Sequence, residues 1–251
     1  MERITSRQNP LLQHLVRLQS GAGERRRSNE IVGDGWKLLD EALRFSALRT
    51  VIAAEGQVLP ALPADVRTVE VPASLLESVS RMETPQGVLF IASRPVEDIS
   101  PLRAGSLILD GVQDPGNVGT VIRAAEAFGA PQIVLTEGCA DPVGPKALRA
   151  SMGSAFRQPV KLAERAEIPG LCRRAGLKLL VTALSDTAKR LGDASLTDAV
   201  VVIGSEGRGV SRTLLDAADE RVIIPMEGQI ESLNAAAAAT VVLWELRRAR
   251  M

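Results

Sequence analysis

Five polar side chains in the second half of the chain are suited to bind and orient a ligand: Asn117, Arg123, Glu206, Ser232 and Asn234. An arginine can hold a phosphate or a carboxylate through two parallel hydrogen bonds. For Arg123 the ordinary alternative is a surface ion pair with Glu126 or Glu206, and such pairs are common and weak. Because Asn117 and Arg123 are six residues apart, on one helix they would lie within about 120° of each other. The five residues predict a polar pocket with an anion clamp.

Other chemistries lose support from the same sequence. His14 is the only histidine and lies in a basic region, so no Ser-His-Asp arrangement is expected. Gly204, Gly207 and Gly209 follow the order G-x-x-G-x-G, whereas the dinucleotide fingerprint is G-x-G-x-x-G. The segment GCADPVGPK fails the spacing of a phosphate-binding loop, and no Ser or Thr follows Lys146. Hydride transfer and phosphoryl transfer are therefore not expected.

The elements that would position these residues begin at Ser106, where strand and helix patterns start to alternate. Helices are expected over 117–129, 145–150 and 211–218, and short apolar runs predict the strands SLILDGV, PQIVLTE, LKLLVTAL, AVVVIGSE and ERVIIPM. Near-continuous apolar strands spaced by helices indicate a parallel sheet covered on both faces. Ligands bind such sheets beyond the carboxyl ends of the strands. Three polar, glycine-rich segments fall there: DGVQDPGNVGTVIR, GSEGRGVS and PMEGQIESLN.

The last of these segments leads into a predicted helix. Ser232 is the expected N-cap, with the helix opening at Leu233 and an unbroken alanine run over 235–239. An alanine run is typical of a buried helix, and its small side chains also allow a ligand or another backbone to approach closely. Polar residues at a helix N-terminus favour polar or anionic ligands, because free N–H groups point there.

The first part of the chain predicts a separate, small α/β unit. Asn9 and Pro10 are the expected cap and first residue of a helix, which continues with an apolar stripe to Leu18. Further helices are expected over 36–45 and 73–82, with strands over 50–54, 66–71 and 87–92. Proline-containing sequence then indicates a linker, which divides the chain into 1–95, 96–105 and 106–251.

Composition limits the partners. Only 2% of residues are aromatic and tyrosine is absent, which argues against RNA recognition by base stacking. The formal net charge is zero, but residues 1–29 hold six arginines against two glutamates, a net charge of +4. Such a basic arm indicates a polyanionic partner or, more commonly, a solvated face. Cys139 and Cys172 are far apart with no CxxC pattern, so we expect neither a metal site nor a disulfide, and a reducing cytoplasm fits. No signal peptide or membrane span is expected.

Taken together, the three polar segments resemble the motifs of the SPOUT class of RNA methyltransferases, specifically the SpoU/TrmH branch that methylates ribose 2′-hydroxyls. DPGNVGTVIRAAEAFGA is similar to the first motif, with Asn117 and Arg123 in the matching positions. VVIGSEGRGVS is similar to the second, with Glu206. IIPMEGQIESLNAAAAATVVLWE is similar to the third, with Ser232 and Asn234. The resemblance covers roughly 106–250.

The resemblance implies an α/β, Rossmann-like domain with a deep C-terminal trefoil knot, and S-adenosylmethionine as methyl donor. Catalysis would fall to the five polar residues, with Arg123 activating or orienting the 2′-hydroxyl. The cofactor would be bound near Thr182, Ala183, Leu184, Gly204, Ile224, Met226 and Leu233. A homodimer is also implied, since family members complete the site across two subunits. Residues of the last helix would form its interface or simply pack on the sheet, namely Val241, Val242 and Trp244.

The stretches ITSRQNPLLQHLVRL and GDGWKLLDEAL resemble the small, ribosomal-protein-like RNA substrate-binding domain that precedes the catalytic domain in ribosomal-RNA members. This chain has Asp34-Gly35 where the family usually shows Glu-Gly. Because such a domain precedes the catalytic part, ribosomal RNA is the favoured substrate. Its phosphates are expected to contact four arginines, Arg7, Arg25, Arg26 and Arg27. Two alternatives stay open: a catalytically silent RNA-binding factor, and a transfer-RNA or base methyltransferase of the same class.

Overall fold

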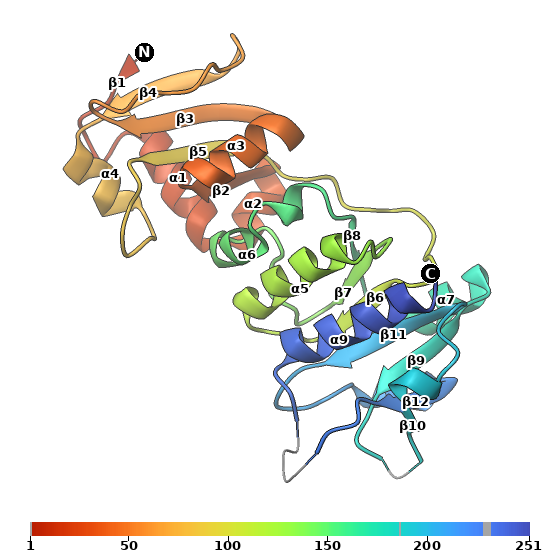
Figure 1. The fold of residues 1–251 in the computed structure, drawn as a ribbon. Coiled ribbons are helices and arrows are strands. Elements are labelled where there is room, and N and C mark those ends of the chain that lie inside the picture. The colour runs from red at the N-terminus through yellow and green to blue at the C-terminus, as the bar shows by residue number, and fades with distance from the viewer. Residues whose placement is uncertain (1, 186, 228–231) are drawn as a thin grey trace. The chain divides into compact units, whose positions relative to one another are not determined.

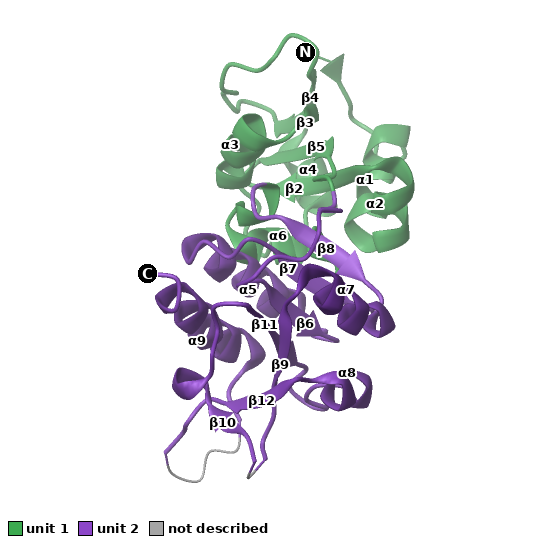
Figure 2. Ribbon diagram, turned by 90° about the vertical axis from the view of Figure 1, so that its right-hand side faces the viewer, with its two compact units in different colours: residues 1–96, 141–156 green, residues 97–140, 157–251 purple. Residues whose placement is uncertain are grey.

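The computed structural model describes residues 2–185, 187–227 and 232–251 (Figure 1). The chain forms two compact units (Figure 2). Unit 1 comprises Met1–Val96 and Asp141–Phe156, and unit 2 comprises Glu97–Ala140 and Arg157–Met251. The domain boundaries predicted from the sequence place 141–156 in the catalytic part, 106–251. In the structure this segment packs within unit 1.

The first helices of unit 1 follow from local sequence. α1 (Pro10–Ser20) begins where Asn9 Oδ1 accepts the Leu11 N–H at 2.9 Å, as the Asn-Pro pair predicts. Its apolar stripe is buried in the core of the unit. α2 (Ala22–Ser28) was not expected from its polar sequence, and it ends at Asn29 in a left-handed conformation. α3 (Trp36–Phe45) and α4 (Ala73–Val79) lie where helices were predicted, α4 ending earlier.

The sheet of unit 1 has the strand order β1-β4-β3-β5-β2. Its strands are β1 (Glu2–Arg3), β2 (Glu30–Asp34), β3 (Leu48–Ala54), β4 (Arg67–Val71) and β5 (Val88–Ser93). β4 is parallel to β1 and β3, and β5 is antiparallel to β2 and β3. β2 was not predicted, because only two of its residues are aliphatic. Its strand conformation depends on pairing with β5, where a Cβ at Gly33 would lie 1.9 Å from the Phe90 ring.

The segment 141–156 completes unit 1. It contains α6 (Pro145–Ser151) and the 3₁₀ turn η1 (Ser154–Phe156), and α6 packs against β2. The Arg25 guanidinium, 6% exposed, forms an ion pair with Asp141 at 2.7 Å and so ties the segment to α2. A buried pair of this kind is costly to break, because either partner alone would be left as an uncompensated charge.

Unit 2 contains a seven-stranded sheet with the order β10-β12-β9-β11-β6-β7-β8. Its strands are β6 (Leu107–Asp110), β7 (Ile133–Thr136), β8 (Val160–Ala163), β9 (Lys178–Thr182), β10 (Lys189–Arg190), β11 (Ala199–Gly204) and β12 (Glu220–Ile223). All neighbouring strands are parallel, which confirms the predicted parallel sheet. β8 and β10 were not predicted, because both are short and carry lysine or arginine.

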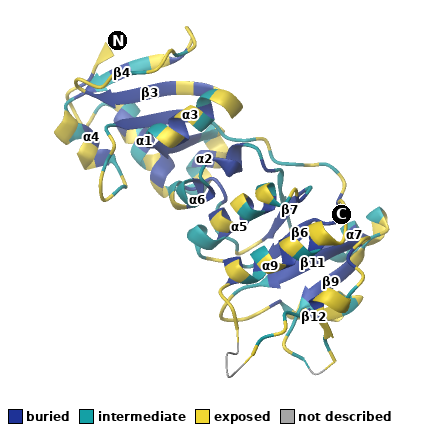
Figure 3. Ribbon diagram, in the orientation of Figure 1, coloured by how far each residue is buried: buried dark blue, intermediate teal, exposed yellow. Residues whose placement is uncertain are grey.

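Helices cover both faces of this sheet, as expected. α5 (Pro115–Ala127) and α9 (Ala235–Arg248) pack together on one face, and α7 (Ile168–Ala175) and α8 (Arg212–Ala217) lie on the other (Figure 2). Short 3₁₀ turns, η2 (Arg165–Glu167) and η3 (Leu191–Asp193), join these elements. The central strands are buried throughout (Figure 3). Such double burial explains the continuous aliphatic runs in their sequences.

The start of the last helix differs from the prediction. α9 begins at Ala235, and Asn234 rather than Ser232 is its N-cap. The Asn234 Oδ1 accepts the N–H groups of Ala236 at 2.9 Å and Ala237 at 3.3 Å. Serine and asparagine are comparably good N-caps, so residue type alone did not show which of the two begins the helix. Ala235, Ala236 and Ala239 are buried, which confirms the core interpretation for these three residues, whereas Ala237 is exposed.

Candidate active site

The carboxyl ends of three parallel strands of unit 2 surround a cavity of about 440 Å³. Its walls come from residues at the ends of β9, β11 and β12 and from the start of α9. This is the edge at which α/β sheets bind ligands, and the volume lies in the usual range for small-molecule sites, about 300–1,000 Å³. Two of the three predicted polar segments, those that carry Glu206 and Ser232, line this cavity.

All seven residues predicted to bind a cofactor line this one cavity: Thr182, Ala183, Leu184, Gly204, Ile224, Met226 and Leu233. Gly204 has a direct steric reason to be glycine. A Cβ at this position would lie 2.0 Å from the Gly209 carbonyl carbon and 2.2 Å from the Val210 nitrogen. The loop after β11 can therefore fold back on its own strand only where no side chain intervenes. The result is a cavity wall made of backbone.

The three polar segments meet in a chain of side-chain hydrogen bonds. The Asn117 Nδ2 donates to the Glu206 Oε1, and the Asn234 Nδ2 donates to the Asn117 Oδ1 at 3.2 Å. Asn117 is thus the central member, bonded to one residue from each of the other two segments. Glu206 also lines the cavity, so this chain of bonds reaches its wall.

Helix capping fixes the two asparagines. Asp114 is the N-cap of α5, and its Oδ1 accepts the Asn117 N–H at 2.9 Å. Asn117 therefore lies in the first turn of α5, just as Asn234 lies at the cap of α9. Because α5 and α9 pack against each other, their N-termini bring both amides together. Free N–H groups at such termini make this region favourable for anions.

The other two predicted catalytic residues stand apart from this chain of bonds. Ser232 lines the cavity but is exposed and makes no side-chain hydrogen bond with the described residues. Arg123, on α5, is exposed and does not line the cavity. It forms no ion pair within the parts of the chain that the structure describes, so the alternative of a surface ion pair with Glu126 or Glu206 finds no support. Its guanidinium is available to another molecule.

The four arginines predicted to contact RNA have different environments in unit 1. Arg7, Arg26 and Arg27 are exposed, and Arg27 forms an ion pair with Glu24. Arg25 is buried, and besides Asp141 it donates to the Leu18 carbonyl. The charge of Arg25 is thus already neutralised within the protein.

One charged residue of the cavity wall was missed by the sequence reasoning. Arg208 lines the cavity, is exposed and has no hydrogen-bond or ion-pair partner among the described residues. It lies between Gly207 and Gly209 in the loop that carries Glu206. Its position between two glycines in a predicted ligand-binding loop could have indicated Arg208 as a residue of the cavity.

The described residues contain neither a metal-binding cluster nor a helix suited to cross a membrane. No group of three or more His, Cys, Asp or Glu side chains there could hold a metal ion. In the same residues, none of the helices has the length and apolar character that a membrane crossing requires.

Comparison with solved structures defines the class of protein. The SpoU methyltransferase AviRb from Streptomyces viridochromogenes, solved in complex with AdoMet, superposes with a TM-score of 0.84. The two sequences are 29% identical, and the match covers 97% of this chain and 98% of that one. A TrmH-family RNA methyltransferase structure from Porphyromonas gingivalis is 33% identical over 94% of this chain and 96% of that one, with a TM-score of 0.83. The α/β fold with its parallel sheet is thus that of the SpoU/TrmH methyltransferases.

Sequence comparison then gives the family. Residues 105–244 match the SpoU rRNA Methylase family, and residues 9–90 match an MRM3-like substrate binding domain. The 23S rRNA (guanosine(2553)-2′-O)-methyltransferase of Bacillus subtilis is 31% identical over 98% of this chain and 100% of its own length. The chain belongs to the SpoU rRNA methylase family, which confirms the resemblance drawn from the three motifs.

Proposed function

We propose that this protein transfers a methyl group from S-adenosylmethionine to a ribose 2′-hydroxyl in RNA, most specifically ribosomal RNA. The observation that carries the proposal is the hydrogen-bonded chain Glu206–Asn117–Asn234, which joins all three family motifs at one cavity. The Bacillus subtilis relative is named as a 23S rRNA 2′-O-methyltransferase acting on guanosine, and a Streptomyces viridochromogenes relative, 31% identical over 99% of this chain, as one acting on uridine. The modified base is therefore left open.

The cavity suits S-adenosylmethionine in size and in lining. Aliphatic side chains such as Leu184 and Ile224 can enclose an adenine ring, while backbone groups at the strand ends can bond its polar edge. The backbone wall at Gly204 allows close approach to a flat ligand. When bound, this cofactor supplies an electrophilic methyl group on its sulfonium. The walls of the cavity hold and orient that group and exclude water from it.

The polar residues then act on the RNA. A 2′-hydroxyl is a poor nucleophile and must lose its proton as attack proceeds. Arginine is effectively always protonated, so it is poorly suited to act as a base. As a cation it can orient the hydroxyl and neutralise a neighbouring phosphate. We assign that role to Arg123. The other four polar residues position the substrate ribose against the cavity wall, namely Asn117, Glu206, Ser232 and Asn234.

A homodimer is part of the proposal. Arg123 lies outside the cavity of its own chain and has no partner in the described residues, as expected of a side chain that serves a second subunit. Val241 and Trp244 on α9 are 38% and 47% exposed. The Trp244 ring packs edge-on against the ring of Phe128, the C-cap of α5, with 5.8 Å between the ring centroids. Val242 is fully buried within the chain, so it belongs to the core of unit 2 and not to an interface.

We assign substrate binding to 1–95 and catalysis to 106–251, joined by 96–105. The first part would be a ribosomal-protein-like domain that contacts RNA phosphates through Arg7, Arg26 and Arg27, with Arg25 supporting α2. We also infer a deep trefoil knot in the catalytic part. The inference rests on the resemblance to the family's motifs. It is compatible with the pairing of β12 with β9 and the packing of α9 on α5 and β11. Two free thiols, Cys139 and Cys172, suit a reducing cytoplasm.

The deciding experiment is ribose-methylation mapping of total RNA from cells with and without this protein, followed by mass spectrometry of the nucleoside. A ribose methylation present only with the protein is the expected result. A methylated base instead would identify a base methyltransferase of the wider class. No modification, with RNA binding retained, would identify a binding factor.

A further inference from the structure

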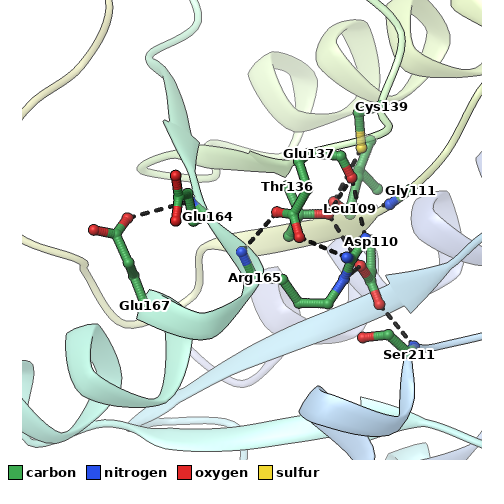
Figure 4. Close-up of polar contacts among 10 residues, drawn as sticks. All are labelled: Leu109, Asp110, Gly111, Thr136, Glu137, Cys139, Glu164, Arg165, Glu167 and Ser211. Atoms are coloured by element: carbon green, nitrogen blue, oxygen red, sulfur yellow. Dashed lines mark hydrogen bonds and ion pairs between the residues drawn. The ribbon is translucent and has the colours of Figure 1, made fainter.

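Asp110 is a buried carboxylate with no part in the chemistry described so far. It is the last residue of β6, is 2% exposed and does not line the cavity. Its Oδ2 accepts the Ser211 N–H at 2.7 Å, and its Oδ1 accepts from Arg165 Nε at 2.6 Å and from Thr136 Oγ1 at 3.0 Å (Figure 4). The carboxylate is therefore bonded to three separate parts of the chain.

The first of these bonds closes the loop that carries Glu206. In the sheet, Gly204 at the start of this loop is the register partner of Asp110. At the other end, Ser211 donates its N–H to the Asp110 side chain. The loop is narrowed between these points by two backbone hydrogen bonds that join Ser205 and Gly209, at 2.8 and 3.2 Å. Asp110 thus lies beside the first residue of the 204–211 loop and is hydrogen-bonded to its last residue, and most residues between them line the cavity.

The second set of bonds orients the segment that carries Asn117. The Thr136 hydroxyl donates to Asp110 and also accepts the Gly111 N–H at 3.2 Å. Gly111 opens the short segment to Asp114, the cap of α5, and Asn117 follows in the first turn of that helix. The Asn117–Glu206 hydrogen bond therefore spans two segments that are both fixed at Asp110.

Arg165 provides the charge that makes this arrangement stable. Its guanidinium binds Asp110 and also forms an ion pair with Glu137 at 2.5 Å. Burial alone would raise the pKa of Asp110, but the hydrogen bonds from Ser211, Arg165 and Thr136 outweigh it and hold that pKa below its usual value. Asp110 is consequently ionised at neutral pH, and its bonds have the strength of charge-assisted hydrogen bonds.

We propose that Asp110 is a positioning residue that holds the 204–211 loop closed against the cavity, and so sets the affinity for the methyl donor. The inference rests on the proposed function in one respect, namely that S-adenosylmethionine occupies this cavity. The Asp110 carboxylate acts through Ser211 and the loop backbone and touches neither cofactor nor RNA.

The test compares Asp110→Asn with Asp98→Asn, because Asp98 is a carboxylate of the same unit with similar bonding. Asp98 accepts from Ser100 N at 2.9 Å and Gln132 Nε2 at 2.7 Å, is paired with Arg103, and lies outside the cavity lining. Both substitutions remove a charge from a bonded site, so both are expected to lower the melting temperature. Only Asp110→Asn should weaken S-adenosylmethionine binding by calorimetry, by about tenfold, as expected for loss of a charge-assisted hydrogen bond.

Steady-state kinetics separates positioning from general destabilisation. In Asp110→Asn the KM for S-adenosylmethionine should rise about tenfold while the KM for RNA stays unchanged. A merely structural role would reduce the folded fraction and move neither KM. If Asp110→Asn does not fold, the isosteric Thr136→Val, which removes one bond to the same carboxylate, should raise the KM for S-adenosylmethionine in the same direction by a smaller factor.

Amide hydrogen exchange tests the loop without any ligand. Exchange of the 205–211 amides in the free protein should be faster in Asp110→Asn than in the wild type, and unchanged in Asp98→Asn. Equal loop exchange and equal affinities in the two variants would overturn the inference. If the wild-type protein failed to bind S-adenosylmethionine, the proposed function would fail, and exchange of the 205–211 amides would still decide the role of Asp110.

Discussion

Asn234 donates its side-chain amide to the Asn117 Oδ1 across 3.2 Å, and with its own Oδ1 it caps α9. A single side chain therefore connects two helix N-termini at the cavity. The two ends of the Asn234 amide make different bonds, since its oxygen caps α9 and its nitrogen donates to Asn117. This division allows the two bonds to be separated by mutation.

Asn234→Asp should retain stability and lose activity. Aspartate is as good an N-cap as asparagine, so the melting temperature should change little. The lost amide donor leaves a carboxylate oxygen facing the Asn117 oxygen, which should disturb the bond to Glu206 and lower methyl transfer at least tenfold. Asn234→Ala is the matched control, because it loses the cap as well and should cost about 1 kcal/mol of stability. Full activity in Asn234→Asp would contradict the catalytic role of this bond.

Arg123→Ala should lose RNA methylation while S-adenosylmethionine binding is retained. The side chain lies outside the cavity and is exposed, so neither cofactor affinity nor stability depends on it. Loss of a cation that stabilises the transition state should reduce turnover by about 100-fold or more. Arg212→Ala on α8 is the control, since Arg212 is also exposed and is paired only within its helix. Near-normal turnover in Arg123→Ala, measured by methyl transfer to RNA, would remove Arg123 from the mechanism.

The sequence was informative wherever local pattern decides structure. Strong periodicity and the Asn-Pro cap predicted α1, and the aliphatic runs predicted the parallel strands β6, β7, β9, β11 and β12. Elements that depend on long-range pairing were missed, such as β2, whose EIVGD sequence has little strand character until it pairs with β5. Which polar residue caps α9 was also decided by tertiary contacts, because Asn234 gains a second bond at Asn117 that Ser232 lacks.

The residues of the candidate site could be predicted from the sequence, but the hydrogen bonds between them could not. The seven cofactor positions were implied by the resemblance to the SpoU/TrmH motifs. Glu206 was expected near them by the rule that ligands bind at the carboxyl ends of parallel strands. No local rule gives the order Glu206–Asn117–Asn234 of the hydrogen bonds, because it requires two helices to pack with their caps aligned. The burial of Arg25 could not be predicted from local sequence either, because its partner Asp141 lies 116 residues away in the chain.

Substitution of two arginines on α2 should weaken RNA binding in a salt-dependent way. Arg26 and Arg27 are exposed, and Arg26 has no ion-pair partner among the described residues. If both contact phosphates, the double variant Arg26→Ala/Arg27→Ala should reduce the slope of log Kd against log salt by about 2. Arg67→Ala is the control, because Arg67 is also exposed and ion-paired, as Arg27 is with Glu24, but lies on β4 and not on α2. An unchanged slope in the double variant would exclude α2 from the RNA interface.

Stability should fall in acid partly through Asp98. Burial raises the pKa of Asp98, but hydrogen bonds from Ser100 and Gln132 and the charge of Arg103 outweigh it, so the folded-state pKa is below 3.8. A carboxylate with a depressed pKa contributes stability above its unfolded-state pKa, and this contribution is lost as the pH falls through the folded-state value. Asp98→Asn should therefore be less stable than the wild type at pH 7, and the difference should shrink below about pH 4.

Asp34 provides the control of opposite sign. Burial raises the pKa of Asp34 above 3.8 despite a hydrogen bond from Ser80, so its ionisation as the pH rises opposes folding. In urea titrations between pH 3 and pH 7, the stability of Asp34→Asn relative to the wild type should improve with rising pH. The same trend in both variants would contradict the assigned bonding.

Gly204→Ala should destroy the cavity wall, whereas Gly207→Ala should be tolerated. The two glycines lie in one loop, but a Cβ at Gly204 would be 2.0 Å from the Gly209 carbonyl carbon, and a Cβ at Gly207 would meet nothing within 4 Å. Because the obstacle at Gly204 is backbone, the loop must move away from β11, at a cost of about 1–3 kcal/mol. S-adenosylmethionine binding, measured by calorimetry on the folded fraction, should be lost in Gly204→Ala and kept in Gly207→Ala. Equal binding by the two variants would mean that the close approach of 204 to 209–210 does not shape the cofactor site.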